Sequence, residues 1–513
     1  MKRLNVMVKV LAVSLLIYGL WSCEKVKKEE FTPAQNEQKL LLAALESDLE
    51  LSQFTEQFRS LDLSASSATG FTILAVKNSA LKDGITAGVL KRHILEKAYT
   101  PSELSEAGKV KSLGGDQLVV KTTEGIVALN NTPIGTHKVV GSSTLFVLDE
   151  VIHEDNKFLG IKSEFSVDLS RVLPLRPEVI ELEDATFEWT QEFKGENSVV
   201  SKELNYDFIT LVSGEYHLSI QATSPNGKTL MASTTVTVAE PEEELKPNPV
   251  RVLDFVPAPG LNQPEEFKTK QIALDKAFEQ MKGGGGNLYL GAFGGYLIVG
   301  FDHTIMNRPG YCDFTTQYGG GDTNISPSTI WVAYDANGNG NPDDEEWYEI
   351  KGSEHGGDND LGMQTYTYQT KKEGGYAWTT QSGEKGIVAD QPPFVDIKIA
   401  PWLAEAGDTF SLTGRQLKPA IKEGDYFNSA LPFAWGYACN QPNNSNQAAI
   451  DIDWAIDKEG NHVHLPGVDF IKVINAIQGM RNMMGEYRFQ VRAIQDLHLL
   501  SKEITTEEAQ SGK

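Results

Sequence analysis

Oxygen-bearing side chains recur at alternate positions along the stretch from Tyr334 to Trp347. Read as a loop of about twelve positions, this stretch offers oxygen ligands at the spacing that calcium loops use. The residues at those positions are Asp335, Asn337, Asn339, Asn341 (through its carbonyl), Asp343 and Glu346. Gly340 permits a sharp turn, and a donor set of hard oxygens suits calcium and not zinc or copper. The spacing predicts a calcium site, and the alternative is an Asn/Gly/Asp-rich turn that holds no metal.

The segments on either side of this loop indicate strands. Thr329–Tyr334 and Trp347–Ile350 are rich in β-branched and aromatic residues. EF-hand loops have the same ligand spacing, but helices flank them. The sequence therefore predicts a structural calcium site in a connection between two strands.

Aromatic residues in polar segments with Gly and Pro are the candidates for ligand binding. Large ligands of mixed polarity are held by aromatic faces and a few polar groups. The four candidates are Trp378, Trp402, Trp435 and Tyr437. The alternative for each of them is ordinary packing in the core.

No catalytic constellation is present in the sequence. Neither a Gly-x-Ser-x-Gly nor a His-Glu-x-x-His motif occurs. His462 and His464, with Asp469 nearby, lack the further His or Cys partners that would complete a metal site. Asp451 and Asp453 are better explained as acceptors that hold a loop, or as contacts to a second calcium. We therefore expect a binding protein and not an enzyme.

Residues 1–22 are typical of a signal peptide, because Lys2 and Arg3 precede an apolar run that is too short to span a bilayer. The residues around Cys23 resemble the lipobox of bacterial lipoproteins, which implies that Cys23 is lipidated. The alternative is an ordinary secreted protein. Residues 23–38 are predicted to be a charged tether, similar to surface-export signals in Bacteroidetes lipoproteins. We expect a lipoprotein that is anchored in the outer membrane and exposed at the cell surface.

The composition limits the partners. The formal net charge of the 513 residues is −24, which disfavours binding to nucleic acid. Apart from Cys23, the cysteines are Cys312 and Cys439. In an oxidising compartment this even pair allows one disulfide, and two free thiols are the alternative.

Residues 39–155 begin with a helical pattern of leucines and end in several short β patterns. Phe71–Asn78, Leu90–Leu95 and the hairpin beginning at Leu129–Ile134 resemble the fasciclin domain, although the usual proline after the first strand is absent. The resemblance implies an α+β domain that serves in adhesion and spacing. We interpret His93 as a core histidine whose hydrogen bonds are satisfied, and not as a ligand.

Residues 160–240 change to short alternating strands around Trp189 and the segment Gly214–Ala222. This pattern predicts a small β-sandwich and resembles a PKD-type, Ig-like domain. Residues 241–250 are rich in Glu and Pro and are predicted to be a stiff linker.

Residues 251–500 are predicted to form a large, mostly antiparallel β-domain, a sandwich or jelly roll. The chain as a whole is thus expected to be multidomain and mainly β. The glycines between Gly283 and Asp302 are interleaved with strand residues, so they indicate bulges or close backbone approaches and not a phosphate-binding loop.

Several segments of this domain resemble the C-terminal domain of a group of Bacteroidetes cell-surface lipoproteins. The matching segments are Leu290–Tyr296, Gly300–His303, Tyr334–Gly340, Asp451–Trp454 and His464–Val473. Some members of the group bind cobamide (vitamin B12) and pass it to a TonB-dependent outer-membrane receptor. The resemblance implies cobamide capture, and the alternative is an adhesive or glycan-binding lipoprotein.

Overall fold

The computed structural model describes residues 31–81, 84–123, 125–154, 157–261, 263–283, 286–319, 325, 327–342, 344–390, 396–422, 429–478 and 489–511. The predicted signal peptide, Cys23 and the start of the tether lie outside the described residues, and so does Asp343. The chain forms two compact units. The first comprises Met1–Gly160, Glu178–Ala185 and Ala222–Leu230, and the second comprises Ile161–Pro177, Thr186–Gln221 and Met231–Lys513. The predicted Ig-like stretch, residues 160–240, is therefore divided between the units.

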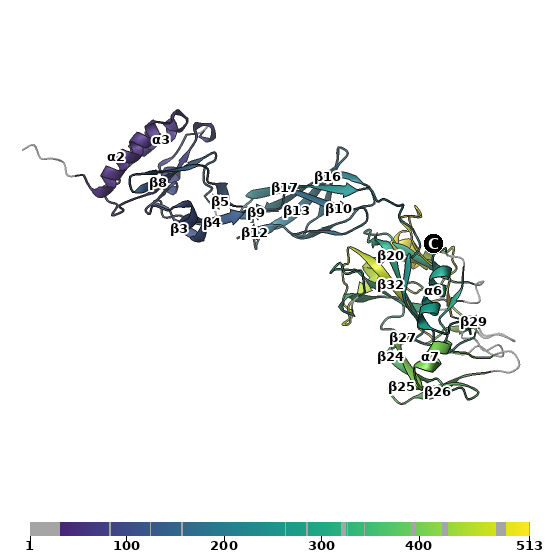
Figure 1. The fold of residues 1–513 in the computed structure, drawn as a ribbon. Coiled ribbons are helices and arrows are strands. Elements are labelled where there is room, and N and C mark those ends of the chain that lie inside the picture. Colours follow the sequence, from purple (N-terminus) through teal and green to yellow (C-terminus); the bar gives the residue numbers. More distant parts are fainter. Residues whose placement is uncertain are drawn as a thin grey trace, which may run out of the picture. The chain divides into compact units, whose positions relative to one another are not determined.

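The N-terminal domain packs two helices against a mixed sheet (Figure 1). One sheet has the strand order β2-β1-β8-β7, in which β1 runs parallel to β8, and the other has the order β3-β4-β5-β6. The helical elements are α2 (Pro33–Glu46), η1 (Leu49–Leu51), α3 (Ser52–Arg59), η2 (Asn78–Ala80), α4 (Ala87–Arg92) and α5 (Pro101–Glu106). The strands are β1 (Thr72–Val76), β2 (Ile94–Leu95), β3 (Lys109–Lys111), β4 (Gln117–Thr123), β5 (Ile126–Leu129), β6 (Thr132–Pro133), β7 (His137–Val140) and β8 (Ser143–Leu148).

The tether prediction for residues 33–38 is wrong, because α2 begins at Pro33. Thr32 forms a capping box with Gln35, and Pro33 occupies the first helical turn, where proline is favoured. Gln38 is buried and donates hydrogen bonds to the carbonyls of Phe58 and Leu61. These residues belong to the folded N-terminal domain.

The Ig-like stretch contains a five-stranded sheet with the order β10-β17-β16-β13-β14, together with the pairs β11-β15 and β12-β9. Trp189 is buried in this stretch, as the sequence predicted, and its indole N–H donates to the carbonyl of Leu204 (3.2 Å). The strands are β9 (Phe158–Gly160), β10 (Glu164–Asp168), β11 (Leu173–Leu175), β12 (Glu178–Ile180), β13 (Thr186–Phe193), β14 (Glu196–Ser201), β15 (Tyr206–Phe208), β16 (Gly214–Thr223) and β17 (Thr229–Ala239).

The C-terminal domain is built on a six-stranded sheet with the order β18-β20-β32-β22-β23-β31. Its members are β18 (Arg251–Val256), β20 (Tyr296–Met306), β22 (Ser328–Ala333), β23 (Trp347–Ile350), β31 (Ala455–Ile456) and β32 (Gly467–Asn475). A four-stranded sheet, β26-β25-β24-β27, consists of β24 (Asp360–Gln369), β25 (Gly375–Thr380), β26 (Lys385–Ala389) and β27 (Thr409–Leu417). A three-stranded sheet, β30-β21-β34, consists of β21 (Phe314–Gln317), β30 (Ala449–Ile450) and β34 (Ala493–Asp496).

Short elements complete this domain. The strand pairs are β19 (Leu288–Tyr289) with β33 (Gln490–Val491) and β28 (Ile421–Lys422) with β29 (Ser429–Ala430). The helical elements are α6 (Lys270–Met281), η3 (Asp344–Glu346), α7 (Pro401–Ala406), η4 (Asn446–Ala448), η5 (Ile452–Trp454) and α8 (Thr506–Ser511). The predicted end at residue 500 is too early, because Ala509 of α8 is buried and Thr506 bonds to Asp451.

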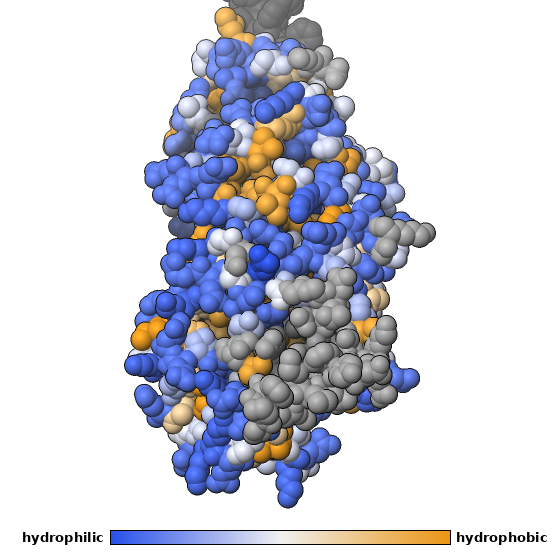
Figure 2. All heavy atoms as spheres, turned by 90° about the vertical axis from the view of Figure 1, so that its right-hand side faces the viewer, coloured by the Kyte–Doolittle hydropathy of each residue, from blue (hydrophilic) through white to orange (hydrophobic). Residues whose placement is uncertain are grey.

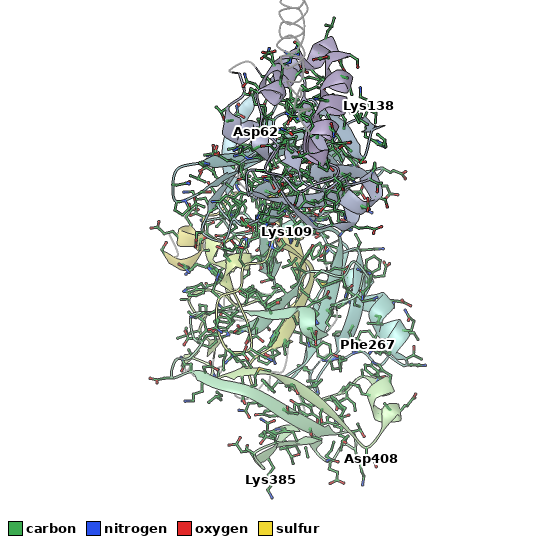
Figure 3. All side chains as sticks on the ribbon, turned by 90° about the vertical axis from the view of Figure 1, so that its left-hand side faces the viewer. Asp62, Lys109, Lys138, Phe267, Lys385 and Asp408 are labelled. Atoms are coloured by element: carbon green, nitrogen blue, oxygen red, sulfur yellow. The ribbon has the colours of Figure 1, made fainter. Side chains whose placement is uncertain are left out.

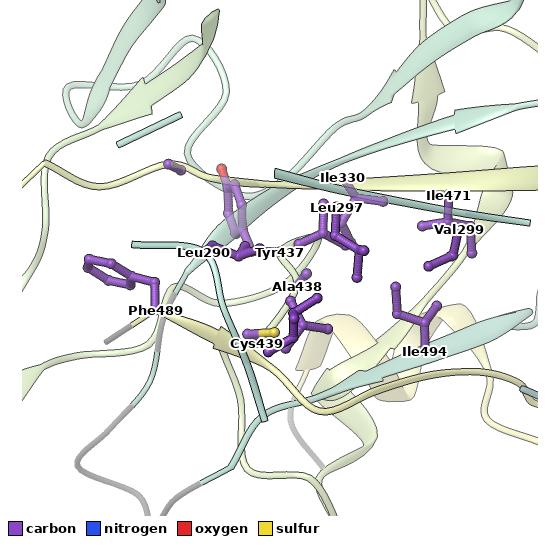
Figure 4. Packing of buried hydrophobic residues seen from close by; sticks show 14 of the residues in the cluster. Leu290, Leu297, Val299, Ile330, Tyr437, Ala438, Cys439, Ile471, Phe489 and Ile494 are labelled. Atoms are coloured by element: carbon purple, nitrogen blue, oxygen red, sulfur yellow. The ribbon is translucent and has the colours of Figure 1, made fainter. Parts of the chain in front are cut away.

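One large apolar core joins the sheets of the C-terminal domain. Leu297 and Val299 of β20 lie beside Ile330 of β22 and Ile471 of β32 (Figure 4). The core extends to Phe267, which is 1 % exposed, whereas charged residues such as Lys385 and Asp408 lie on the surface (Figure 3). One face of the molecule is mostly hydrophilic, with apolar patches between the polar side chains (Figure 2).

Two glycines confirm the predicted close backbone approaches. A Cβ on Gly291, whose φ is +77°, would lie 2.1 Å from the carbonyl oxygen of Ala258. A Cβ on Gly295 would lie 1.8 Å from the carbonyl oxygen of Leu290. Any larger residue at either position would displace the backbone beside β20.

Candidate functional site

The loop from Tyr334 to Glu346 connects two antiparallel neighbours, β22 and β23, with Ala333 opposite Trp347. The predicted strand flanks are therefore confirmed. This arrangement fixes both ends of the loop, because each end continues into a strand of the central sheet.

The oxygen atoms of the loop's polar side chains turn toward the loop's own amides. Asp335 accepts hydrogen bonds from the N–H of Asn339 (3.0 Å) and, through its other oxygen, from that of Gly340 (2.8 Å). Asn337 also accepts from the N–H of Asn339 (2.9 Å), and Asn339 accepts from that of Asn341 (2.7 Å). Three alternate side chains thus accept hydrogen bonds from backbone N–H groups of the same loop.

The end of the loop folds back on its start. Glu346 accepts a hydrogen bond from the N–H of Ala336 (3.1 Å), so the last predicted donor lies beside the first. Gly338 and Gly340 have φ values of +69° and +75°, which non-glycine residues rarely adopt. A metal-free Asn/Gly/Asp-rich turn forms the same hydrogen bonds, so the calcium site stays a prediction.

Carboxylates alone do not define a metal site in this protein. Within the described ranges, no group of three His, Cys, Asp or Glu side chains is placed to hold a metal ion. A cation at this loop would therefore depend on the amide oxygens of Asn337 and Asn339 and on the carbonyl of Asn341, in addition to Asp335 and Glu346.

Asp469 on β32 binds the start of the loop through a hydrogen bond. One of its carboxylate oxygens accepts from the N–H of Asp335 (2.9 Å). The other accepts from the hydroxyl of Thr304 (2.7 Å) and from Arg171 (3.0 Å). Burial raises the pKa of Asp469. The start of the loop is thus bonded to the central sheet through one buried carboxyl.

A pocket of about 370 Å³ adjoins the loop. Its wall includes Arg171, Arg251, Thr304, Asp335, Asp469 and Phe470. The Arg251 guanidinium lies over the Phe470 ring, 5.2 Å from its centre. The sequence reasoning missed Arg171, Arg251 and Thr304, because they are distant from the loop in sequence and follow no local motif.

The four predicted ligand-binding aromatics lie in separate surroundings. Trp378 packs on Tyr366 (ring centres 4.6 Å apart), and Trp435 packs on Trp454 (4.8 Å). Trp402 lies on α7 at the edge of the main core.

Tyr437 is 1 % exposed, and its hydroxyl accepts from the N–H of Glu354 (3.0 Å). The ring of Tyr437 is therefore part of the core, which is the alternative that the sequence left open for this residue. Core packing also describes the contacts of Trp378 and Trp435.

The two cysteines are free thiols, so the disulfide alternative is wrong. Cys312 and Cys439 are both buried, and the thiol of Cys439 donates to the carbonyl of Gln317 (3.7 Å). Burial raises the pKa of both thiols.

Asp451 and Asp453 hold loops, as expected. Asp451 accepts from the N–H of Asp453 (2.8 Å), and Asp453 accepts from Asn307 (2.8 Å). His464 is exposed and pairs with Asp453 (3.2 Å), while His462 is exposed nearby. Each carboxylate thus accepts hydrogen bonds from partners of its own.

A buried network of histidine and aspartate was not predicted. His303 contacts Asp302 through Nδ1 (2.7 Å) and Asp496 through Nε2 (2.8 Å). His498 contacts Asp313 (3.1 Å) close by. A weak signal existed in the sequence, since Asp302 and His303 are adjacent, but their partners lie nearly two hundred residues away.

In the N-terminal domain, His93 has the satisfied core position that the sequence predicted. Its Nδ1 donates to the carbonyl of Val89 (2.8 Å), and its Nε2 accepts from the N–H of Ile152 (3.0 Å). Burial lowers the pKa of His93 to about 4. With both ring nitrogens occupied, His93 has no capacity left for a ligand.

The fold is that of a multidomain, mainly β protein with an N-terminal fasciclin domain. The fasciclin domain family matches residues 44–154, which confirms the predicted resemblance. This is a non-enzymatic, adhesion-type domain, and the remainder of the chain consists mostly of sheets.

Curated proteins and solved structures give no further evidence on the rest of the chain. No curated protein matches the chain. Among the solved structures that match, murine CRIg is similar over 17 % of this chain and 98 % of its own, at 8 % identity and a TM-score of 0.14. So small a score carries no argument. None of the helices in the described part of the chain has the length and apolar character that crossing a bilayer requires.

Proposed function

We propose that this chain is a non-enzymatic surface lipoprotein that binds an extracellular ligand, with a calcium ion stapling the β22–β23 loop of its C-terminal domain. The observation that carries the proposal is the convergence of the Asp335, Asn337 and Asn339 side-chain oxygens inside one loop. The fasciclin domain adds support for an adhesive role at the cell surface.

In this proposal Asp335, Asn337, Asn339, the Asn341 carbonyl, Asp343 and Glu346 hold the ion. Calcium supplies a positive charge and a cross-link among these oxygens. Because Asp335 is also bonded to Asp469, the cross-link would stiffen the connection between β22, β23 and β32. The role is structural, since both flanks are strands of one sheet.

The anchor is the lipid on Cys23, at the surface of the outer membrane. A Cys23→Ser variant should move from the membrane fraction to the soluble fraction, and protease added to intact cells should digest the wild-type protein. Retention of the variant in the membrane would rule out lipidation as the anchor.

The first candidate role is adhesion or glycan binding. The fasciclin match supports it, and a pocket of about 370 Å³ has the size of a small-molecule site. The four aromatics expected to hold either a sugar or a corrinoid pack on different partners, so they favour neither ligand.

Cobamide capture with transfer to a TonB-dependent receptor is the second proposal. It is supported by the placement of the segments that carry the resemblance. Gly300–His303 lies in β20, and Tyr334–Gly340 directly follows β22. Most of His464–Val473 lies in β32, so this segment and Gly300–His303 lie in the central sheet and Tyr334–Gly340 directly follows one of its strands. The resemblance therefore describes a common framework.

Calorimetry separates the two proposals. The chain from residue 24 onward is titrated with cyanocobalamin, and the same preparation is applied to a glycan array, each with calcium and after its removal by EDTA. Glycan binding without cyanocobalamin heat supports adhesion, and tight one-to-one cyanocobalamin binding supports capture. Absence of calcium binding in a direct titration would overturn the staple.

A further inference from the structure

The pocket beside the loop brings together residues that neither proposal above uses. Arg171 comes from the Ig-like stretch, Arg251 from β18 and Phe470 from β32, and all three line the same cavity of about 370 Å³. Two guanidinium groups line this cavity together with the carboxylates of Asp335 and Asp469.

The two arginines differ in what already satisfies them. Arg171 donates to the Asp469 carboxylate (3.0 Å) and to the carbonyl of Asp302 (2.8 Å), so its charge has a partner. The Arg251 side chain forms no ion pair or hydrogen bond with any residue in the described part of the chain. The Phe470 ring contacts one face of the guanidinium, and within the described ranges no residue accepts a hydrogen bond from the N–H groups at its edge.

The rest of the cavity suits the body of a small polar ligand. Phe301 and Phe470 are nearly fully buried and form an apolar floor, while the Thr304 hydroxyl retains the capacity to accept a hydrogen bond. The guanidinium fork matches the two oxygens of a carboxylate. An apolar floor, hydroxyl groups and a planar cation are the features that recognise a sugar acid.

The calcium loop forms another part of the wall. Asp335, Gly338 and Gly340 line the cavity, and a Cβ placed on Gly340 would lie 4.0 Å from the Nη1 atom of Arg251. Without a bound cation, the carboxylate of Asp335 repels an incoming anion. With calcium in the loop that negative charge is compensated, and the net field at the pocket favours an anion.

We propose that this pocket binds the carboxylate of a uronic acid, with Arg251 as the residue that determines specificity and with calcium in the loop as a requirement. The inference rests on the proposed calcium staple and names the ligand class of the proposed glycan binding. By thermodynamic reciprocity, uronate must tighten calcium binding by the same factor by which calcium tightens uronate binding.

The test uses the full chain in detergent and three probes: glucuronate, glucose and acetate. Calorimetric titrations are run with calcium and again after calcium has been removed by EDTA and the chelator dialysed away, and the heat of each probe in calcium buffer is subtracted. We expect glucuronate to bind with calcium, glucose and acetate to bind at least about tenfold more weakly, and glucuronate affinity to fall at least about tenfold without calcium.

Arg251→Gln should weaken glucuronate binding about tenfold or more while the calcium affinity measured without the sugar stays unchanged. The matched control is Arg308→Gln, because Arg308 also stacks on an aromatic ring, Tyr311 at 3.9 Å, but does not line the pocket. It should bind glucuronate like the wild type. Circular dichroism checks that both variants fold.

The outcomes separate this inference from the calcium staple. If no calcium binds, the staple fails. If calcium binds but glucuronate gives no heat, or glucose binds equally well, the uronate site is overturned and the staple stands. Equal binding with and without calcium in the wild type overturns the calcium requirement without reference to any variant.

Discussion

Two buried histidines, one in each compact unit, have opposite protonation behaviour. His93 in the fasciclin domain and His303 in the C-terminal domain are both fully buried as residues. Burial lowers the pKa of His93 to about 4. Burial also opposes the charged form of His303, but hydrogen bonds to Asp302 and Asp496 outweigh it and raise its pKa.

The difference comes from the partners and not from the depth of burial. A backbone carbonyl and a backbone N–H satisfy His93 as a neutral ring. Two carboxylates face the two nitrogens of His303, an arrangement that requires protons on both. His93 is thus held by neutral hydrogen bonds, whereas His303 belongs to a charged network that must remain complete.

Asp496→Asn should have the largest effect on this comparison. It removes the negative partner of a fully buried imidazolium, and we expect the C-terminal domain to lose about 3 to 5 kcal/mol of unfolding free energy. In the chain from residue 24 onward, tryptophan fluorescence during urea unfolding reports only the second compact unit, which contains the C-terminal domain, because residues 24–160 contain no tryptophan. Asp302→Asn, at a position that is partly exposed, should cost less. An unchanged urea midpoint for Asp496→Asn would show that the network contributes nothing.

His93→Ala is the matching change in the fasciclin domain. The loss of the ring leaves a cavity and an unpaired N–H on Ile152, so we expect a loss of about 3 to 4 kcal/mol. In circular dichroism the unfolding transition of the fasciclin domain should move to lower urea, and the transition measured by tryptophan fluorescence should stay unchanged. His137→Ala, at an exposed histidine of β7, is the control and should change little. A shift of the tryptophan transition by His93→Ala would contradict the assignment of this residue to a separate core.

Local patterns predicted much of the fold. The strands on both sides of the Asp335 loop were predicted from β-branched and aromatic residues, because such residues suit a pleated surface wherever they occur. His93 was predicted as a core residue because its segment follows the fasciclin pattern. The start of α2 was missed although its signal was local, since Thr32 and Gln35 form a capping box.

Long-range partners could not be predicted in the same way. Arg171 and Asp469 are 298 residues apart, and nothing near either one indicates the other. Tyr437 was a candidate ligand contact because it lies in a polar segment with Gly and Pro, but the ring fills the core beside Phe433. Burial of this kind depends on which sheets stack, and that is a property of the whole domain.

The pH dependence of stability should separate the two units. For His93, the unfolded state binds a proton below about pH 6.5 that the native state does not take up until about pH 4. The fasciclin domain should therefore gain about 2.5 kcal/mol as the pH rises from 4.5 to 7.

The C-terminal domain should respond in the opposite direction. The native state holds protons on His303 above the unfolded pKa, and burial raises the pKa of Asp313 to about 7. Both groups stabilise the native state at low pH and lose that contribution as the pH rises through their native pKa values. Urea unfolding at several pH values between 4.5 and 8, followed by circular dichroism and tryptophan fluorescence, measures both slopes. Parallel slopes would refute the contrast between the histidines.

Calcium binding should change the free energy of unfolding least of all, and it should change that of one unit only. At a free concentration ten times the dissociation constant, calcium stabilises the unit that binds it by about 1.4 kcal/mol. We expect the tryptophan transition to move by this amount while the fasciclin transition stays fixed.

Glu346→Gln should abolish the calcium shift, because Glu346 is the proposed last ligand, and its carboxylate already lies against the start of the loop. Glu345→Gln is the matched control, since this neighbouring exposed carboxylate lies outside the ligand spacing. If both variants lost the shift equally, the effect would come from the general negative charge of the segment and not from a coordinated ion. If only Glu346→Gln lost it, the loop would add a third way of holding a core, beside the neutral hydrogen bonds of His93 and the charged network of His303.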